Sequence, residues 1–329
     1  MMSIIDNIKM WLIAARPRTL TASVSPVLVG VALAYSKGVV NVPLSILILL
    51  VALLAQIASN YANDYFDFIN GVDTNERRGP ERAVAKGWVT PKAMLTATVV
   101  VTLCAAVLGI TVVSLTSWWL IVLGIFIIIG VFAYSAGPYP LSSNGLGDVA
   151  VMLFYGIIPV CGTIFALTGD LTMRGFLLSL SMGFVAMNVL VVNNYRDYES
   201  DRSTNKITSI VKYGEGFGEM LYIFCAASAL ISAVLGICII DSTGEDIVAN
   251  TDNFLSMVGG GGIGSFSDIY MSNKFWLAVF VVEFAVLQYI AWQKMRNGRG
   301  EAEQLNSVLA LTARNVFIWA IFLTIILVM

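Results

Sequence analysis

The chain has 329 residues, of which 58% are hydrophobic and 12% are charged, with a mean hydropathy of +0.82 and a formal net charge of −2. A soluble domain carries about 25% charged residues, so this composition excludes an ordinary soluble domain and predicts an integral membrane protein. The sequence contains no histidine, which argues against haem ligation, the common zinc sites and Ser-His-Asp catalysis.

Apolar runs long enough to cross a bilayer recur along the chain and predict an all-α membrane fold. An amphipathic run from Ile4 to Ala15 comes first and is expected to lie along the membrane interface. We expect one domain, residues 1–329, with nine transmembrane helices. Their expected positions are 20–36, 43–66, 93–115, 117–135, 147–167, 175–195, 217–240, 274–293 and 309–328.

The distribution of lysine and arginine predicts the orientation of these helices. Most of the 19 basic residues fall in the N-terminal segment and in the loops after the second, sixth and eighth spans. By the positive-inside rule, we expect the N-terminus on the cytoplasmic side of a bacterial-type inner membrane and the C-terminus outside. The acidic, glycine-rich segment 241–273 is then an extracytoplasmic loop, and the sequence assigns it no role.

Polar residues close the second span, where an ordinary membrane helix would carry Leu or Val. Asp64 and Asp67 are three residues apart and share a helical face, with Asn60 one turn before Asp64. Gly71 is the expected helix end, so Asp73 is assigned to the following loop. Acidic residues inside a membrane helix are costly, and the usual reason for them is function.

A second cluster closes the sixth span in the same way. Asp197 and Asp201 are four residues apart on one helical face, and Asn193 lies one turn earlier. Two carboxylate pairs on the same side of the membrane would repel each other unless cations lay between them. Mg²⁺ binds oxygen ligands and is typically shared between a few carboxylates and substrate phosphates. The two clusters therefore predict a magnesium site that faces a diphosphate.

Basic residues accompany both clusters and could bind that diphosphate, because Arg gives bidentate contacts and Lys a point charge. Those near the clusters are Arg77, Arg78, Arg82 and Lys86 after the first, and Arg196, Arg202 and Lys206 within the second. A transporter is the alternative from another class, since polar residues in spans also mark ion pathways. It would place acids near the bilayer midplane, whereas these lie at span ends.

The clusters resemble the two motifs of the UbiA-type membrane prenyltransferases. The first is Asn63-Asp64-Tyr65-Phe66-Asp67 followed by Gly71, Asp73, Gly79-Pro80, Arg82 and Gly87, and the second is Asn194-Tyr195-Arg196-Asp197-Tyr198-Glu199-Ser200-Asp201 followed by Lys206 and Thr208. The stretches Arg16-Pro17-Arg18-Thr19-Leu20, Tyr134-Ser135-Ala136-Gly137-Pro138 and Gly145-Leu146-Gly147-Asp148 are most similar to the branch that acts on 1,4-dihydroxy-2-naphthoate in menaquinone biosynthesis. Asn205 departs from the pattern, because related branches place a third aspartate there. The long loop 241–273 is also outside it.

The resemblance implies a bundle of nine helices around a central cavity open to lipid, in which a polyprenyl tail lies. It implies Mg²⁺-dependent transfer of that tail from polyprenyl diphosphate to 1,4-dihydroxy-2-naphthoate, with loss of CO₂ and diphosphate, giving demethylmenaquinone. The alternative within the fold is another aromatic acceptor, such as 4-hydroxybenzoate. Membrane lipid is the expected surrounding, and no nucleic-acid partner is expected.

By motif position, the resemblance also implies the site residues. The catalytic metal ligands are Asp64, Asp67, Asp197 and Asp201. The residues expected at the diphosphate are Asn60, Asn63, Arg82, Lys86, Asn193, Arg196 and Lys206. The residues expected at the aromatic acceptor are Arg16, Tyr134 and Ser135.

Overall fold

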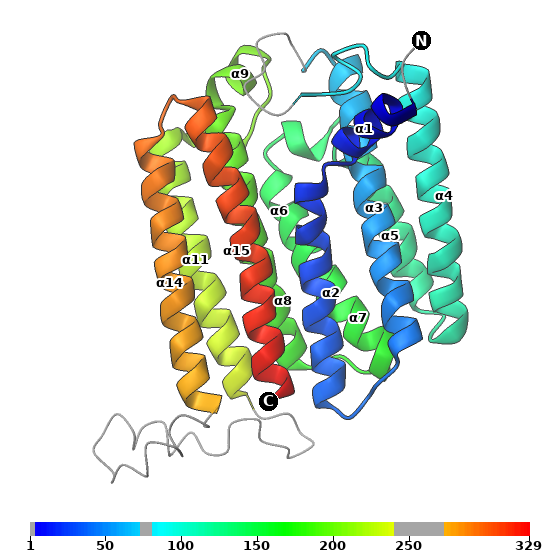
Figure 1. Ribbon diagram of the computed structural model, residues 1–329, viewed down its shortest axis with the longest axis vertical. Coiled ribbons are helices and arrows are strands. Elements are labelled where there is room, and N and C mark those ends of the chain that lie inside the picture. The colour runs from blue at the N-terminus through cyan, green and yellow to red at the C-terminus, as the bar shows by residue number, and fades with distance from the viewer. Residues whose placement is uncertain (1–3, 73–80, 240–272) are drawn as a thin grey trace.

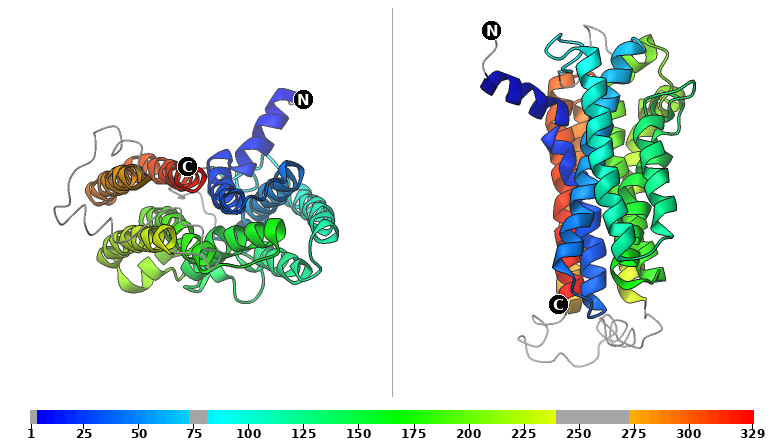
Figure 2. Two further views of the ribbon diagram at one scale, coloured as in Figure 1. Left: turned by 90° about the horizontal axis from the view of Figure 1, so that it is seen from below. Right: turned by 90° about the vertical axis from the view of Figure 1, so that its right-hand side faces the viewer.

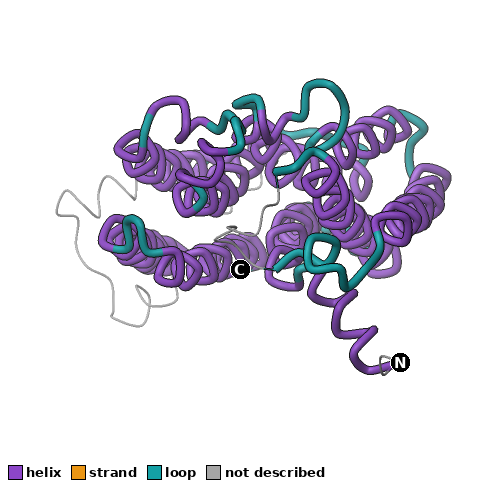
Figure 3. Tube along the Cα trace, turned by 90° about the horizontal axis from the view of Figure 1, so that it is seen from above, coloured by secondary structure: helices purple, strands orange, loops and turns teal. Residues whose placement is uncertain are grey.

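The computed structural model describes residues 4–72, 81–239 and 273–329. Figure 3 shows these ranges as helices joined by loops. Eight helical segments are long and apolar enough to cross a membrane, and a shorter apolar helix, α5, adds a ninth candidate among the described residues. The eight are α2 (Pro17–Ser36), α3 (Val42–Ile69), α4 (Pro91–Leu115), the α6–η2–α7 segment (Gly147–Thr168), α8 (Met173–Arg196), α11 (Glu215–Cys238), α14 (Asn273–Asn297) and α15 (Ala302–Val328), and α5 is Leu120–Ala133.

The all-α membrane fold predicted from the sequence is therefore confirmed. Eight of the nine expected spans overlap a helical segment of membrane-crossing length, and the fourth, 117–135, overlaps only the shorter α5. The fifth span is not one regular helix: it consists of α6 (Gly147–Met152), a π turn η2 (Leu153–Ile157) and α7 (Ile158–Thr168). Three sequence predictions lie outside the described residues. They are the loop position of Asp73, the contribution of Arg77 and Arg78 to diphosphate binding, and residues 241–272 of the outer loop.

Local sequence signals explain where several helices begin. Pro lies in the first turn of α2, α3 and α4, where its missing N–H costs no hydrogen bond. Side chains of Asn41, Thr90 and Thr172 accept hydrogen bonds from backbone N–H groups in the first turns of α3, α4 and α8. Such caps satisfy amides that the helix itself leaves without an acceptor.

The long helices stand side by side along one axis (Figure 1), and a view along that axis shows them in two rows (Figure 2). The α14, α15 and α2 helices form part of one row, and α11 and α8 belong to the other. Helix α1 (Ile4–Ala15) projects from one end of the bundle, across the direction of the long helices. Its Ile8 and Leu12 are more than half exposed, which suits the predicted position at the membrane interface.

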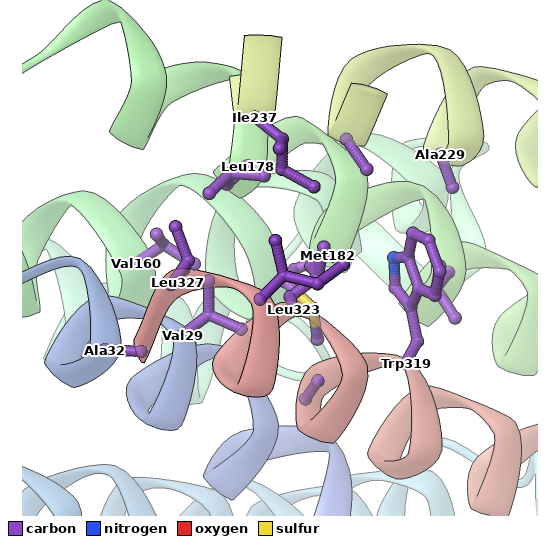
Figure 4. Packing of buried hydrophobic residues seen from close by; sticks show 14 of the residues in the cluster. Val29, Ala32, Val160, Leu178, Met182, Ala229, Ile237, Trp319, Leu323 and Leu327 are labelled. Atoms are coloured by element: carbon purple, nitrogen blue, oxygen red, sulfur yellow. The ribbon is translucent and has the colours of Figure 1, made fainter. Parts of the chain in front are cut away.

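The main core lies where α2, α7, α8, α11, α14 and α15 meet (Figure 4). Trp319 is 1% exposed, and its indole Nε1 donates to the Ser181 hydroxyl at 2.9 Å. Ser181 in turn donates to the carbonyl of Ala229 at 2.8 Å. These bonds satisfy polar groups that would otherwise be unpaired in an apolar interior. Large apolar residues instead cover the outside of α4 and α5, where lipid would contact them.

Candidate active site

A single large cavity of about 1040 Å³ contains most of the predicted site residues. One end is polar and receives side chains from the ends of α3 and α8, from the start of α2 and from α15. The rest is lined mainly by apolar residues of α3, α4, α5 and α7. The polar residues that line it include Arg16, Gln56, Asn60, Asn63, Asp67, Arg82, Tyr134, Asp148, Tyr155, Asn193, Asn194, Asp197, Asp201, Lys206 and Asn306.

The first acidic cluster holds the segment that follows α3. Asp64 is 1% exposed, and its carboxylate accepts hydrogen bonds from the backbone N–H groups of Ala83 at 3.0 Å and Val84 at 3.2 Å. Asp67, one turn later, forms a buried ion pair with Arg82 at 2.9 Å. Asp67 and Arg82 line the cavity, whereas Asp64 lies behind them. The two aspartates thus have different surroundings although they share a helical face.

Asn63 joins two elements that the sequence assigned to the aromatic acceptor. Its Oδ1 accepts from the Arg16 guanidinium at 2.8 Å, and its Nδ2 donates to the Ser135 hydroxyl at 2.8 Å. Tyr134, next to Ser135, lines the cavity, and Ser135 supports Asn63 from behind. The structure therefore brings Arg16, Tyr134 and Ser135 to one place, as their joint assignment requires.

The backbone at Arg16 is itself unusual, with φ 51° and ψ 70° between α1 and α2. A left-handed conformation at a residue other than Gly costs roughly 1 to 3 kcal/mol and tends to occur at functional sites. Burial lowers the pKa of the Arg16 guanidinium below its ordinary value, and the carboxylates of Asp64 and Asp67 oppose that shift. This charge is therefore held in a confined position by nearby anions.

Asn60 and Gln56 continue the polar face of α3 deeper into the bundle. Asn60 donates to the carbonyl of Ala15 at 2.8 Å and to the Thr19 hydroxyl at 3.0 Å. It also accepts a hydrogen bond from Gln56 at 3.2 Å. These contacts fix the start of α2 against α3, so Asn60 positions the turn that carries Arg16.

The second acidic cluster centres on Arg196, whose side chain is fully buried. The guanidinium donates to both oxygens of Asp197, at 2.8 and 2.7 Å, in a bidentate pair. It also donates to Oδ1 of Asn306 at 2.9 Å and to Oδ1 of Asn193 at 2.8 Å. Arg196 therefore lies behind the cavity wall and orients three residues that do line the cavity.

Asp201 lies on α9 (Tyr198–Ser203) and is 5% exposed. Lys206 contacts its carboxylate at 3.2 Å, and both residues line the cavity. The turn between them passes through Asn205 at φ 57°. Asn tolerates this left-handed conformation better than most residues, which gives a backbone reason for the departure from the family pattern noted in the sequence.

Three of the described basic residues that were predicted to bind the diphosphate do not line the cavity: the exposed Arg202, together with Lys86 and Arg196. Lys86 is about half exposed and forms an ion pair with Glu81 at 3.2 Å, and Arg196 is the buried residue described above. Their contacts with a diphosphate stay predictions, as does metal ligation by Asp64. Among the described residues, the candidates that face the cavity are Arg16, Asn60, Asn63, Asp67, Arg82, Tyr134, Asn193, Asp197, Asp201 and Lys206.

Sequence reasoning did not assign several polar residues that line the same cavity, among them Gln56, Asp148, Tyr155 and Asn306. Gln56 did carry a signal, because an amide within an apolar span is costly unless it is satisfied. Asp148 was noted only as part of a family stretch. Tyr155 and Asn306 gave no signal, because aromatic residues and helix-end amides are ordinary in membrane helices.

The donor set suits a hard cation that is shared with a phosphate ligand. Asp67, Asp197 and Asp201 supply carboxylate oxygens on one cavity, which is the ligand type that Mg²⁺ prefers. Within the described ranges, no three acidic or cysteine side chains are close enough to hold a metal by themselves. Because Mg²⁺ is commonly bound through one or two carboxylates, water and substrate phosphates, the residues fit such a shared ion.

Known proteins are similar to most of this chain. Residues 23–244 match the model of the UbiA prenyltransferase family. The 1,4-dihydroxy-2-naphthoate octaprenyltransferase of Mycobacterium leprae is 35% identical over 226 residues, which are 68% of this chain and 76% of the relative. The enzyme of the same name from Escherichia coli is 34% identical, over 64% of this chain and 70% of the relative.

Solved structures share the fold. A UbiA homologue of Archaeoglobus fulgidus bound to GPP and Mg²⁺ superposes with a TM-score of 0.63 at 13% identity, covering 97% of this chain and 100% of that one. The apo structure of a UbiA homologue from Aeropyrum pernix K1 gives a TM-score of 0.60 at 14% identity, covering 92% and 98%.

Proposed function

The chain belongs to the UbiA prenyltransferase family and is a multi-pass membrane prenyltransferase, and on that premise we propose that it transfers a polyprenyl group from polyprenyl diphosphate to 1,4-dihydroxy-2-naphthoate. The observation that carries this proposal is the division of the cavity. Carboxylates and cations gather at one end, and an apolar chamber extends from it. That arrangement suits a substrate with a charged head and a hydrocarbon tail.

In the proposed complex, the diphosphate lies between the two acidic clusters. Arg82 and Lys206 donate to its oxygens, and each is already held by a carboxylate, Asp67 or Asp201. Asn193 and Asp197 contribute from the α8 side, in positions fixed by Arg196. Mg²⁺, when bound by Asp67, Asp197 and Asp201, would neutralise charge on the diphosphate.

The reaction then needs little acid–base chemistry from the protein. The C–O bond between the allylic carbon and the diphosphate breaks, and the diphosphate leaves with that electron pair. The ring carbon that carries the carboxylate forms a bond to the allylic carbon, and the carboxylate leaves as CO₂, which restores the aromatic ring. Donors that bind the leaving diphosphate more tightly as its charge grows would lower the barrier.

In the proposed complex, Asp64 acts mainly through its hydrogen bonds to backbone N–H groups. Its two hydrogen bonds to residues 83 and 84 set the position of Arg82, the residue immediately before them.

We also infer that the polar end of the cavity faces the cytoplasm of a bacterial-type inner membrane, with the C-terminus outside. The support is the concentration of basic residues at that end of the bundle.

The proposal is tested with the full-length protein in membrane vesicles. The vesicles receive radiolabelled polyprenyl diphosphate and Mg²⁺, with either 1,4-dihydroxy-2-naphthoate or 4-hydroxybenzoate. We expect labelled prenylated product and release of CO₂ only with the naphthoate. Product with the benzoate alone would overturn the choice of acceptor. Absence of product with both acids, in vesicles where the protein is folded, would overturn prenyl transfer to these acceptors.

A further inference from the structure

Below Arg16 and Asn63, the cavity wall contains a polar group that the proposed function leaves without a role. It is formed by Tyr155 on η2, Gln56 on α3 and Ser23 on α2. The Tyr155 hydroxyl donates to Oε1 of Gln56 at 2.6 Å, and the Ser23 hydroxyl donates to the same oxygen at 2.8 Å. Gln56 is 6% exposed and Ser23 is 8% exposed, so an apolar interior surrounds these bonds.

Gln56 is held in one orientation by its partners. Its Oε1 accepts the two hydroxyl bonds, and its Nε2 donates to Oδ1 of Asn60 at 3.2 Å and to the Thr19 hydroxyl at 3.4 Å. An inverted amide would face two of these acceptors with an oxygen and would lose both bonds. The amide oxygen therefore points toward Tyr155.

This orientation decides what Tyr155 can offer to a ligand. A phenol has one O–H to donate and lone pairs that accept. The Tyr155 proton is committed to Gln56, so its oxygen can serve a ligand in the cavity only as a hydrogen-bond acceptor. Because Tyr155 lines the cavity and is partly exposed there, the group that binds beside it must be a donor. A ring hydroxyl satisfies this condition, and a carboxylate does not.

The π turn explains why Tyr155 has this position. Gly156, the next residue, packs directly against the backbone of α8, and an added Cβ would lie 2.6 Å from Cα of Gly183. Phe154 lies against Gly130 of α5 and stacks on Phe126 with ring centroids 5.4 Å apart. The turn is thus fixed on both sides, and π turns within α-helices are frequent at functional sites.

Arg16, at the other end of the same cavity wall, favours a hydrogen-bond acceptor, whereas Tyr155 favours a donor. Its guanidinium has five N–H groups, and Asn63 takes one of them in a hydrogen bond. A carboxylate in the cavity is the natural partner for the rest. Asn63 and Gln56 are seven residues apart on α3, which is about 10 Å along a helix. One substituted ring with a hydrogen bond of about 2.8 Å at each end spans a comparable length.

From this geometry we propose that Tyr155 is an acceptor-orienting residue. The aromatic acid binds with its carboxylate at Arg16 and with the ring hydroxyl farther from that carboxylate donating to the Tyr155 oxygen. The inference rests on the proposed function, since it takes a hydroxylated aromatic acid as the acceptor. For 1,4-dihydroxy-2-naphthoate, the hydroxyl at Tyr155 is the one on C4. This bond fixes the orientation of the ring.

The test compares Tyr155→Phe with the wild-type protein on two ligands, in the full-length protein in detergent micelles. The first is 1,4-dihydroxy-2-naphthoate, measured as kcat/KM for prenyl transfer and as Kd. The second is 1-hydroxy-2-naphthoate, which lacks the C4 hydroxyl, measured as Kd. A neutral hydrogen bond contributes about 0.5 to 1.5 kcal/mol, so we expect the variant to bind the dihydroxy acid roughly 3- to 10-fold more weakly. Its Kd for the monohydroxy acid should be unchanged.

Tyr139→Phe is the matched control, because Tyr139 is 60% exposed and lies outside the cavity wall. It should leave both affinities and the melting temperature unchanged. If Tyr155→Phe raises the Kd of both ligands by the same factor, Tyr155 has a purely structural role and the inference is overturned. Unchanged binding of both ligands would overturn it as well. Failure of the wild-type protein to prenylate the dihydroxy acid would count against the proposed function, whereas the ratio of the two Kd changes reports on Tyr155.

Discussion

Replacement of Asp64 by Asn separates its effect on position from any effect on chemistry. The carboxylate is 1% exposed and accepts one backbone N–H at each oxygen. Asn keeps one carbonyl oxygen but brings an NH₂ group against the other N–H donor. One charge-assisted hydrogen bond is lost, and its buried N–H is left without an acceptor. Leaving a buried donor unsatisfied in this way costs about 1 to 3 kcal/mol.

We therefore expect Asp64→Asn to lower the free energy of unfolding by about 1 to 3 kcal/mol, out of the 5 to 15 kcal/mol typical of folded proteins. The loosened segment includes Arg82, so the KM for polyprenyl diphosphate should rise and turnover should fall strongly. Denaturant titration in detergent micelles measures the first effect, and steady-state kinetics measures the second.

Asp170→Asn is the control, because that carboxylate is largely exposed and pairs only with Lys37 at 2.8 Å among the described residues. Exposed pairs contribute about 0 to 1 kcal/mol, and we expect wild-type turnover. Wild-type stability of Asp64→Asn together with lost turnover would refute the positioning argument and leave a direct role in the chemistry. Wild-type stability and wild-type turnover together would refute both roles.

Three further outcomes follow from the structure. Chelation of Mg²⁺ should abolish prenyl transfer, and added Mg²⁺ should restore it; full activity in excess chelator would contradict the shared-ion site. Gly156→Ala should destabilise the protein by about 1 to 3 kcal/mol, because the added Cβ would lie 2.6 Å from the backbone of α8. At the control position Gly216 nothing lies within 4 Å of an added Cβ, so Gly216→Ala should be neutral or slightly stabilising. Equal melting temperatures of the two variants would refute this prediction. Lys37 lowers the pKa of Asp170 through a hydrogen bond and its charge. The pair therefore stabilises the folded protein above the unfolded-state pKa of Asp170, and this contribution is lost as the pH falls through the lower folded-state pKa. An Asp170→Asn variant with an unchanged acid-unfolding curve would speak against this prediction.

Much of the architecture could be predicted from composition and pattern. Apolar runs of membrane-crossing length identify helices reliably because backbone polar groups in lipid must be satisfied within each segment. The interruption by η2 could not be predicted, since Leu153–Ile157 contains no proline and continues the hydrophobic run apart from Tyr155 and Gly156. The close approach of Gly156 to Gly183 makes that turn compatible with packing, and this contact joins residues far apart in the sequence.

For the site, the pattern of residues along the chain was enough to indicate which residue types could do the chemistry: two Asn-plus-Asp clusters of helical spacing with basic residues beside them. Charge and spacing are local properties, so Asp67, Asp201 and Lys206 could be assigned to a diphosphate site without tertiary information. Only the tertiary structure decided which member of each cluster faces the cavity. Asp64 and Asp67 look equivalent on a helix, but the backbone of residues 83 and 84 covers one and Arg82 pairs with the other. Arg196 is likewise turned inward because Asn306, distant in sequence, completes its hydrogen bonds. Long-range contacts of this kind depend on how whole helices pack, and no short motif encodes them.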